Sequence, residues 1–526
     1  MSGGAQADTA TNGSASLVRT LVQGGVGICF ANPGTSEMHF VSSLDRIDGI
    51  RCVLALFEGV ATGAADGFYR MSGKPACTLL HLGPGLANGL ANLHNARKAR
   101  SGIVNIVGEH ANYHIALDAP LTSDIQGLAR PMSDWVKTSL SSETVAADGA
   151  EAVAQARSGA GRVATLILPA NTAWGPGGPT APVQSPQART PVDAQVVKAA
   201  ARALSAGGPN LLFMGGAALR GESLLLAGKI AAKTGCRLCA ENLNARLERG
   251  AGRVPMPRLP YSVKAALAQL ADVRRVVLVG AKAPVAFFAY PDMPSVLTPE
   301  GCDISTLCDV NGDIEAALRS LAEELGAQNV APALMPGGGV TASSITGAIS
   351  AAGIGEVLGQ QLPEGAIVVD ESITTGRLFG AGTDQAAPHD WLGSMGGSIG
   401  FGMPIALGAA LAKPGQRVLA LEGDGSAMYT PQSLWSMARE GAKVTVVIFA
   451  NRSYEILKGE LANVGAGMPG KRANEMLTLD RPVLSWTLMA RSMGVESGQA
   501  VNLEELAAQL QRGLRCDGPY LIEVVF

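Results

Sequence analysis

Residues 418–454 read VLALEGDGSAMYTPQSLWSMAREGAKVTVVIFANRSY, and they give the clearest indication of the fold class. An apolar run leads into the GDGS turn at residues 423–426, a helical stretch follows, and a second apolar run ends at Asn451. This alternation predicts parallel strands joined by a crossover helix, and ligands of such sheets bind at the carboxyl ends of the strands. Asp424 and Asn451 are therefore expected at the same sheet edge, one strand-helix-strand excursion apart.

The side chains at this edge suit a metal ion and a phosphate group. The Asp424 carboxylate, the Asn451 amide oxygen and a nearby backbone carbonyl are hard oxygen ligands of the kind that Mg²⁺ prefers. The glycines let backbone N–H groups approach phosphates, and the helix that begins after Ser426 adds a favourable field. A GDG turn alone is common, but an Asn at the end of the next strand favours the metal and phosphate site.

Short β-branched runs recur along the chain and alternate with longer stretches rich in Ala, Leu and Gly, which predicts further crossover units. Strands are expected at residues 103–107, 165–168, 211–214, 276–279, 366–369, 417–421, 444–449 and 520–525. Helices are expected at residues 193–204 and 503–514. Apolar strands of this kind need cover on both faces, so the expected fold class is α/β with doubly wound parallel sheets.

Two stretches rich in Pro and Gly, residues 171–190 and 328–343, are predicted to be linkers. They divide the 526 residues into segments of common domain size. We therefore expect three doubly wound domains, at residues 1–175, 190–330 and 345–526.

Composition excludes several classes of function. The formal net charge is −3, so no global positive field exists to hold nucleic acid or an anionic membrane. No window approaches 18 uninterrupted apolar residues, and residues 1–16 lack the features of a secretory signal, which predicts a cytoplasmic protein. The Cys236 and Cys239 pair has no second pair of Cys or His nearby, so we expect ordinary buried thiols.

The 418–454 stretch closely resembles the diphosphate-anchoring motif of thiamine diphosphate-dependent enzymes. In that family the Asp, the Asn and the carbonyl two residues after the Asn bind the metal, which implies Mg²⁺ ligands at Asp424, Asn451 and Ser453. The resemblance places the cofactor diphosphate near Gly423, Gly425, Ser426 and Tyr454. It also makes the first domain pyrimidine-binding, the middle domain non-catalytic and the last domain diphosphate-binding.

Two more motifs resemble the same family. Glu58, in LFEGV at residues 56–60, follows an expected strand at residues 52–56 and resembles the glutamate that activates the aminopyrimidine ring. By itself it could be a solvated acid at a helix start. Ile399, in GGSIGFG at residues 396–402, resembles the apolar wedge beneath the two cofactor rings, or else is a core residue. Further cofactor contacts are implied at Gly397, Ser398, Ser372 and Thr374.

Two short motifs resemble benzoylformate decarboxylase in particular. Thr35, in NPGTSE at residues 32–37, matches the position that meets the substrate carboxylate, and His81, in LHLGPG at residues 80–85, matches a proton-relaying histidine. A second histidine of that enzyme is replaced by Ala289, so Tyr290, His110 or His114 would have to substitute. Weaker candidates for the substrate pocket are His110, Phe288, Ala289, Ile456 and Leu457.

Acetolactate synthase large subunits resemble the chain too, through GPG at residues 83–85. Their flavin-associated pattern has no counterpart near residues 280–284, so thiamine diphosphate and Mg²⁺ are expected as cofactors and FAD is not. The resemblance implies a decarboxylase or carboligase of small 2-oxo acids that works through a ylide and an enamine. The alternatives are an FAD-free acetolactate synthase-like enzyme and a non-catalytic scaffold or regulatory subunit. The family resemblance also implies a homodimer as the minimum working unit, since two subunits share each active site in that family, and it favours a homotetramer.

Overall fold

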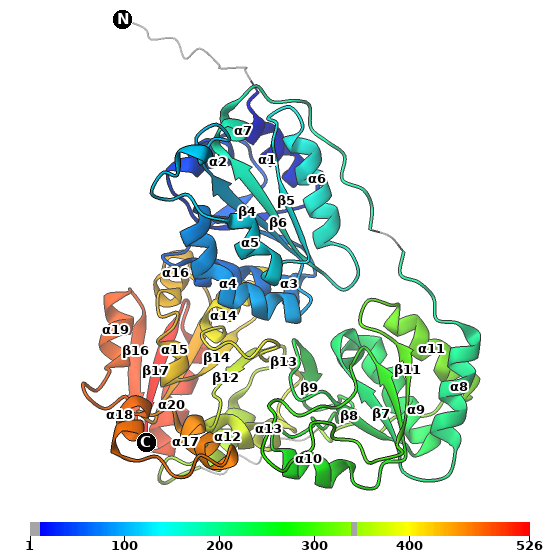
Figure 1. Ribbon diagram of the computed structural model, residues 1–526. Coiled ribbons are helices and arrows are strands. Elements are labelled where there is room, and N and C mark those ends of the chain that lie inside the picture. The colour runs from blue at the N-terminus through cyan, green and yellow to red at the C-terminus, as the bar shows by residue number, and fades with distance from the viewer. Residues whose placement is uncertain (1–10, 187, 338–344) are drawn as a thin grey trace, which may run out of the picture. The chain divides into compact units, whose positions relative to one another are not determined.

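Three sheets of mostly parallel strands form the framework of the computed structural model, which describes residues 11–186, 188–337 and 345–526 (Figure 1). The expected α/β class with parallel sheets is confirmed. The described chain separates into two compact units. The first holds the residues up to 186 together with Leu407–Ala412, and the second holds the rest. The three domain boundaries stay a prediction.

The first sheet has the strand order β2-β1-β3-β4-β6-β5, and all its neighbours are parallel. Its strands are β1 (Ile28–Asn32), β2 (Arg51–Leu54), β3 (Ala76–Leu80), β4 (Ile103–Glu109), β5 (Trp135–Thr138) and β6 (Val163–Pro169). The helices of this unit are α1 (Gly13–Gln23), α2 (Met38–Arg46), α3 (Glu58–Ser72), α4 (Leu82–Lys98), α5 (Ile125–Ala129), α6 (Val145–Ala156) and α7 (Ala170–Trp174).

Both faces of the first sheet are covered, as the apolar strands require. Side chains of α1, α2 and α6 pack on one face in a single buried cluster with β3, β4 and β6. On the other face Phe30 of β1 meets Phe68 of α3 edge to face, with ring centroids 6.5 Å apart. Strands β3, β4 and β6 are buried along their whole length, which is typical of a central parallel strand.

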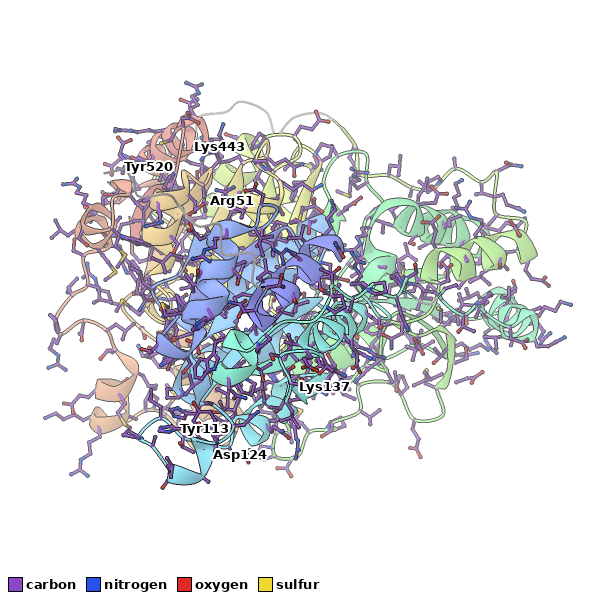
Figure 2. All side chains as sticks on the ribbon, turned by 90° about the horizontal axis from the view of Figure 1, so that it is seen from above. Arg51, Tyr113, Asp124, Lys137, Lys443 and Tyr520 are labelled. Carbon is purple, nitrogen blue, oxygen red and sulfur yellow. The ribbon has the colours of Figure 1, made fainter. Side chains whose placement is uncertain are left out.

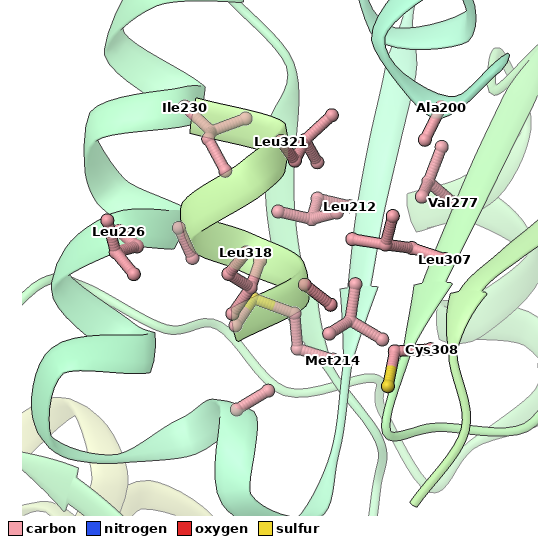
Figure 3. Packing of buried hydrophobic residues seen from close by; sticks show 14 of the residues in the cluster. Ala200, Leu212, Met214, Leu226, Ile230, Val277, Leu307, Cys308, Leu318 and Leu321 are labelled. Carbon is pink, nitrogen blue, oxygen red and sulfur yellow. The ribbon is translucent and has the colours of Figure 1, made fainter. Parts of the chain in front are cut away.

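The second sheet has the order β11-β10-β7-β8 and is parallel throughout. Its strands are β7 (Asn210–Met214), β8 (Arg237–Ala240), β10 (Arg275–Val279) and β11 (Asp303–Cys308), and its helices are α8 (Ala194–Ser205), α9 (Gly221–Thr234), α10 (Val263–Leu270) and α11 (Ile314–Glu324). Successive residues of β7 face opposite sides: Leu212 packs toward α9 and α11 (Figure 3), and Phe213 packs with α10.

The third sheet has the order β16-β17-β15-β14-β12-β13-β9. Its strands are β9 (Leu247–Arg249), β12 (Ile367–Glu371), β13 (His389–Leu392), β14 (Val418–Gly423), β15 (Val444–Ala450), β16 (Glu496–Ala500) and β17 (Tyr520–Val525). The helices are α12 (Ala351–Gln361), α13 (Phe379–Thr383), α14 (Gly402–Ala412), α15 (Asp424–Ala427), α16 (Ser433–Glu440), α17 (Glu455–Asn463), α18 (Lys471–Leu477), α19 (Trp486–Ser492) and α20 (Leu503–Arg515). Helices α12 and α20 bury one face, where the ring of Tyr520 lies in the core (Figure 2).

The elements expected from the sequence are present, with shifts at their ends. The expected strand at 52–56 is β2, which ends at Leu54, so Glu58 opens helix α3 and does not end a strand. The first expected linker starts later, because α7 occupies its beginning. The second linker has no helix or strand at 328–337, and its residues 338–343 lie outside the described residues.

Strand β9 was not expected, because it is only three residues long. It lies between β8 and β10 in the chain, yet it pairs antiparallel with β13 at the edge of the third sheet. Arg246, just before β9, binds Asp390 of β13 through both guanidinium and carboxylate groups, the closest N–O distance being 2.6 Å. The expected buried thiols are confirmed, since Cys236 and Cys239 are free and buried. None of the helices in the described ranges combines the length and hydropathy of a bilayer-crossing segment.

Candidate active site

In the first unit, the residues predicted to meet the substrate follow the carboxyl ends of β1 and β3. Thr35 opens a short 3₁₀-helix (Thr35–Glu37) and is exposed, and His81 precedes the first residue of α4. The imidazole Nδ1 of His81 lies 2.8 Å from Glu37 Oε2. The N–H of Gly34 donates to the same carboxylate oxygen at 2.7 Å. The two loops that the sequence singled out are therefore joined by Glu37, which the sequence analysis did not select.

Glu37 is fully buried, and its contact with Nδ1 fixes the orientation of the His81 ring. Burial raises the pKa of the Glu37 carboxyl, while the charge of His81 and the N–H of Gly34 act in the opposite direction. With Glu37 ionised, Nδ1 of His81 carries the hydrogen and Nε2 is left to accept or return a proton. The close approach also needs a glycine, because a Cβ at Gly34 would lie 2.2 Å from His81 Nδ1.

Glu58 lies at the start of α3 and is 7% exposed. The side-chain amide of Asn88, on α4, donates to Glu58 Oε2 at 3.0 Å. The other oxygen faces Gly85 of the same helix, where a Cβ would lie 3.1 Å from Glu58 Oε1 and 3.4 Å from His81 Cβ. Glu58 and His81 therefore approach the same glycine, and a larger side chain at Gly85 would press on both of them.

His110 follows β4 at the same sheet edge. Its ring centroid lies 5.3 Å from that of His114, and its Nε2 is buried without a partner among the described residues. Burial lowers the pKa of His110, and the charges of His114 and His81 lower it further. The neutral form of His110 is therefore favoured relative to a free imidazole, and His81 is close enough to contribute to this effect.

In the second unit, the predicted metal ligands follow adjacent parallel strands, β14 and β15. Asp424 accepts the N–H of Gly425 on one oxygen at 2.9 Å and the N–H of Arg452 on the other at 2.7 Å. Asn451 Oδ1 accepts the N–H of Ser453 at 3.0 Å. The expectation that Asp424 and Asn451 share one sheet edge is met, because the Asp424 carboxylate binds the residue directly after Asn451.

The donor set fits a single hard cation. Burial raises the pKa of Asp424 to about 6, and no lysine or arginine of the described residues forms an ion pair with it. A buried carboxylate without a cationic partner is costly, and a bound divalent cation removes that cost. Within the described ranges no group of three or more His, Cys, Asp or Glu side chains could hold a metal, so a site here must rely on amide and carbonyl oxygens as well.

The residues predicted at the cofactor diphosphate lie around the same turn. Gly425 and Ser426 are buried in the four-residue helix α15, directly after Gly423. The Tyr454 ring lies over Gly425, where a Cβ would be 2.4 Å from Tyr454 Cε1. Burial raises the pKa of Tyr454, and nearby Tyr429 and Asp424 raise it further.

Ser372 and Thr374 follow β12 on the neighbouring strand end. The Ser372 hydroxyl donates to Asp370 Oδ1 at 2.5 Å, and its side chain is buried. Thr374 is half-buried at the start of a 3₁₀-helix (Thr375–Leu378) and makes no capping bond with its side chain. Of these two hydroxyls, that of Thr374 is the one more available to a ligand.

The predicted wedge, Ile399, lies half-buried in a loop of residues 393–401 that contains neither helix nor strand. Gly397 and Gly400 of this loop have φ angles of +77° and +86°, in the left-handed region. The N–H of Gly400 donates to Glu371 Oε1 at 2.6 Å, and that of Gly402 donates to Glu371 Oε2 at 2.5 Å. Ser398, between Gly397 and Ile399, is half-buried.

Glu371 and Glu422 form a buried pair of carboxyl groups beneath this loop. They are partners across the parallel strands β12 and β14. Burial raises the pKa of Glu371 to about 7, and burial together with the neighbouring Glu371 raises the pKa of Glu422 well above its usual range. Burial and the proximity of the two carboxyl groups therefore both disfavour a state in which the two are ionised together.

The weaker pocket candidates lie on two segments of the second unit. Phe288 and Ala289 are exposed, and the neighbouring Phe287 reaches Gly397, where a Cβ would lie 2.9 Å from its Cζ. On α17, Ile456 is half-buried and Leu457 is exposed. A hydrogen bond of 2.9 Å from the Tyr290 hydroxyl to Glu460 of α17 joins the two segments.

Family comparisons match both ends of the chain. The description "Thiamine pyrophosphate enzyme, N-terminal TPP binding domain" matches residues 11–130, and "Thiamine pyrophosphate enzyme, C-terminal TPP binding domain" matches residues 377–524. The chain is 48% identical over 516 residues to "Putative acetolactate synthase large subunit IlvX" of Mycobacterium tuberculosis, which covers 98% of this chain and 99% of that protein. The chain belongs to the thiamine pyrophosphate enzyme family.

Other relatives agree with this assignment. The chain is 29% identical over 534 residues to benzoylformate decarboxylase of Pseudomonas aeruginosa, across 95% of this chain and 96% of that one. A solved thiamine diphosphate-dependent 4-hydroxybenzoylformate decarboxylase of Rhodococcus jostii RHA1 shares the fold, with a TM-score of 0.81 at 22% identity over 98% of both chains. The protein is a thiamine diphosphate-dependent enzyme of the decarboxylase and acetolactate synthase group, and the resemblance seen in the sequence is confirmed.

Each unit of this thiamine pyrophosphate enzyme carries one set of predicted site residues. The first unit gathers Thr35, Glu58, His81 and His110 at one sheet edge, and the second gathers the predicted metal and diphosphate residues. Sequence reasoning missed the residues that hold them, namely Glu37, Asn88, Glu371, Glu460 and Thr430, whose hydroxyl donates to the carbonyl of Gly400 at 3.0 Å. Only Glu37 and Glu371 carried a signal, because each lies within a few residues of a strand end and a predicted site residue.

Proposed function

We propose that the protein is a Mg²⁺-dependent 2-oxo acid decarboxylase or carboligase, in which Thr35 meets the substrate carboxylate and His81 transfers protons. The observation that carries the proposal is the Glu37–His81 pair beside Gly34 and Thr35. It leaves one imidazole nitrogen free for acid–base work next to an exposed hydroxyl.

Thiamine diphosphate, when bound, supplies the carbon nucleophile and the electron sink for decarboxylation. The chain supplies orientation and proton control. We assign Glu58 to the aminopyrimidine ring, because its carboxylate is buried and is positioned by Asn88. We assign the metal to Asp424, Asn451 and the Ser453 carbonyl, and the diphosphate to the backbone around Gly425.

At the substrate, the Thr35 hydroxyl donates a hydrogen bond that orients the carboxylate. His81 Nε2 then holds or delivers the proton that decides the product. Delivery of a proton to the decarboxylated fragment of the substrate gives an aldehyde. Reaction of the same fragment with a second carbonyl compound gives a 2-hydroxy ketone. His110, whose pKa is lowered by burial and by the charges of His114 and His81, is the candidate for the second proton-transfer group in place of the histidine replaced by Ala289.

A second candidate is an FAD-free acetolactate synthase-like reaction. The name of the relative that is 48% identical favours it. In that case the second carbonyl compound is itself a 2-oxo acid. We propose further that the working enzyme is a homodimer at minimum, with a homotetramer favoured, because enzymes of the family that the sequence resembles share each active site between two subunits.

The test incubates purified protein with thiamine diphosphate, Mg²⁺ and a panel of pyruvate, branched 2-oxo acids, benzoylformate and glyoxylate. CO₂ release is recorded, and aldehydes are separated from hydroxy ketones. Aldehyde from one substrate supports the decarboxylase, whereas acetolactate from pyruvate supports the second candidate. Bound cofactor without reaction of any 2-oxo acid would contradict both. Visible flavin absorbance in the purified protein would contradict the expected absence of FAD.

A further inference from the structure

Glu371 ends β12 with its side chain enclosed beneath the glycine loop at residues 393–402. It is 1% exposed, and its two carboxylate oxygens serve different main-chain donors, Gly400 and Gly402. A carboxylate can accept at both oxygens, whereas a carboxamide offers one acceptor and a competing donor. This position therefore requires the two acceptor oxygens of a carboxylate. A glutamine side chain has the same size but lacks the second acceptor.

The loop is held by individual hydrogen bonds and not by regular secondary structure; among them, the N–H of Gly397 donates to the Ser394 hydroxyl at 2.9 Å. Residues 393–401 form no helix or strand, and the left-handed Gly397 and Gly400 allow conformations that other residues rarely adopt. The Thr430 hydroxyl donates to the carbonyl of Gly400 at 3.0 Å from the opposite side. The peptide group before Gly400 and the one after it are thus each held by a buried side chain, Glu371 and Thr430 respectively.

Neighbouring atoms close off alternative positions of the loop. A Cβ at Gly400 would lie 2.4 Å from Tyr429 Cβ, and one at Gly402 would lie 2.1 Å from Glu422 Oε1. The backbone between them is consequently in contact on several sides. Loss of one hydrogen bond to Gly400 would therefore displace the backbone of Ile399, the residue directly before it.

We propose that Glu371 is a positioning residue for the cofactor: its carboxylate fixes the glycine loop so that Ile399 and the Gly397 carbonyl are presented in the geometry that thiamine diphosphate needs. The inference rests on the proposed function, in which this loop contacts the cofactor. Glu371 itself touches no reacting atom. It acts through the main-chain N–H groups of Gly400 and Gly402.

The test compares E371Q with E523Q. Glu523 is a matched control, since it is also buried in the third sheet and accepts a main-chain N–H, that of Thr487, at 3.2 Å. Thiamine diphosphate affinity is measured by calorimetry at saturating Mg²⁺, together with kcat and the melting temperature of the cofactor-free protein. E371Q should lose about tenfold or more in both affinity and kcat, because small misplacements of binding groups are costly. E523Q should keep both within about twofold, with a similar melting temperature.

A purely structural role for Glu371 would lower the melting temperature and leave the affinity of the folded protein unchanged, and that result would overturn the proposal. Should E371Q fail to fold, T430V removes the other hydrogen bond to Gly400 and should weaken cofactor binding by about threefold or more. Unchanged affinity in T430V would then overturn the proposal. Wild-type protein that binds no thiamine diphosphate would instead overturn the proposed function.

Discussion

Glu37, Glu58 and Glu371 are chemically identical side chains that are held in three different ways. Glu37 binds an imidazole ring, Glu58 binds a side-chain amide, and Glu371 binds two main-chain N–H groups. All three are buried. Buried carboxylates are retained only where specific partners satisfy them, so the partner of each one indicates its role.

The first prediction concerns the partner of His81. Glu37→Gln should lower kcat by about 10²-fold, because the amide can donate to Nδ1 and so favour the wrong imidazole tautomer. Affinity for thiamine diphosphate should stay within about twofold, since Glu37 binds no predicted cofactor residue. Steady-state kinetics with the substrate found in the panel, and calorimetry, measure the two quantities.

A matched control is Glu151→Gln in the same unit. Glu151 is exposed and pairs at the surface with Lys137, which is labelled in Figure 2, with an N–O distance of 2.8 Å. Exposed pairs contribute little, so this variant should behave as the wild type. Equal kcat values in the Glu37 and Glu151 variants would contradict the assigned role of Glu37.

At the scale of elements, helix α17 directly follows the predicted metal ligands and has no buried residue. Its link to the middle of the chain is Glu460, which accepts from Tyr290 at 2.9 Å and from Tyr261 at 3.4 Å. Helices with few buried contacts open at low free-energy cost. We therefore expect these tyrosine hydrogen bonds to control the opening of α17.

Tyr290→Phe removes the shorter bond, which is worth about 1 kcal/mol or about a fivefold change in the opening equilibrium. Amide hydrogen exchange of residues 455–463 should quicken by about that factor, and the melting temperature should change little. Tyr113→Phe is the control, because Tyr113, labelled in Figure 2, is exposed in the first unit and its hydroxyl has no hydrogen-bond partner among the described residues. Equal exchange in both variants would contradict the role of Glu460.

Acid sensitivity can be traced to His389, the first residue of β13. Its Nδ1 lies 2.7 Å from the Ala387 carbonyl, and burial lowers its pKa to about 4 from 6.5. The unfolded chain therefore takes up a proton near pH 6.5 while the folded chain does not. Stability is present above pH 6.5 and is lost as the pH falls toward 4.

This loss should reach about 2 kcal/mol between pH 7.5 and pH 5. His389→Gln keeps a donor for Ala387 and does not titrate, so it should lose less stability than the wild type over the same range. Urea unfolding of both proteins at the two pH values measures the difference. Parallel losses in the two proteins would show that His389 is not the cause.

At the scale of the whole molecule, what the sequence predicted was local. The strand ends, the GDGS turn and Asn451 follow from apolar runs and spacing, which the chain carries within a few dozen residues. The Glu37–His81 contact joins residues 44 positions apart and depends on how β1 and β3 pair, which no single stretch encodes. Strand β9 was missed for a similar reason, because three residues acquire strand geometry only from their pairing with β13.

The residues predicted to serve the cofactor are distributed over the two compact units of the chain. Glu58 belongs to the first unit, and Asp424 belongs to the second. If both serve one cofactor, a change at Glu58 should stop turnover while the metal and diphosphate residues, all in the second unit, still bind thiamine diphosphate. A single variant at Glu58 would then separate the binding of thiamine diphosphate from turnover.

The most direct measurement compares CO₂ release from the responsive 2-oxo acid by wild-type protein and Glu58→Gln, each with thiamine diphosphate and Mg²⁺. The wild type should release CO₂ only when the cofactor is present. The variant should bind the cofactor and keep its melting temperature, but its turnover should be slower by a factor of about 10² or more. Wild-type rates in Glu58→Gln, or CO₂ release without thiamine diphosphate, would contradict the assignment of Glu58 and the proposed reaction with it.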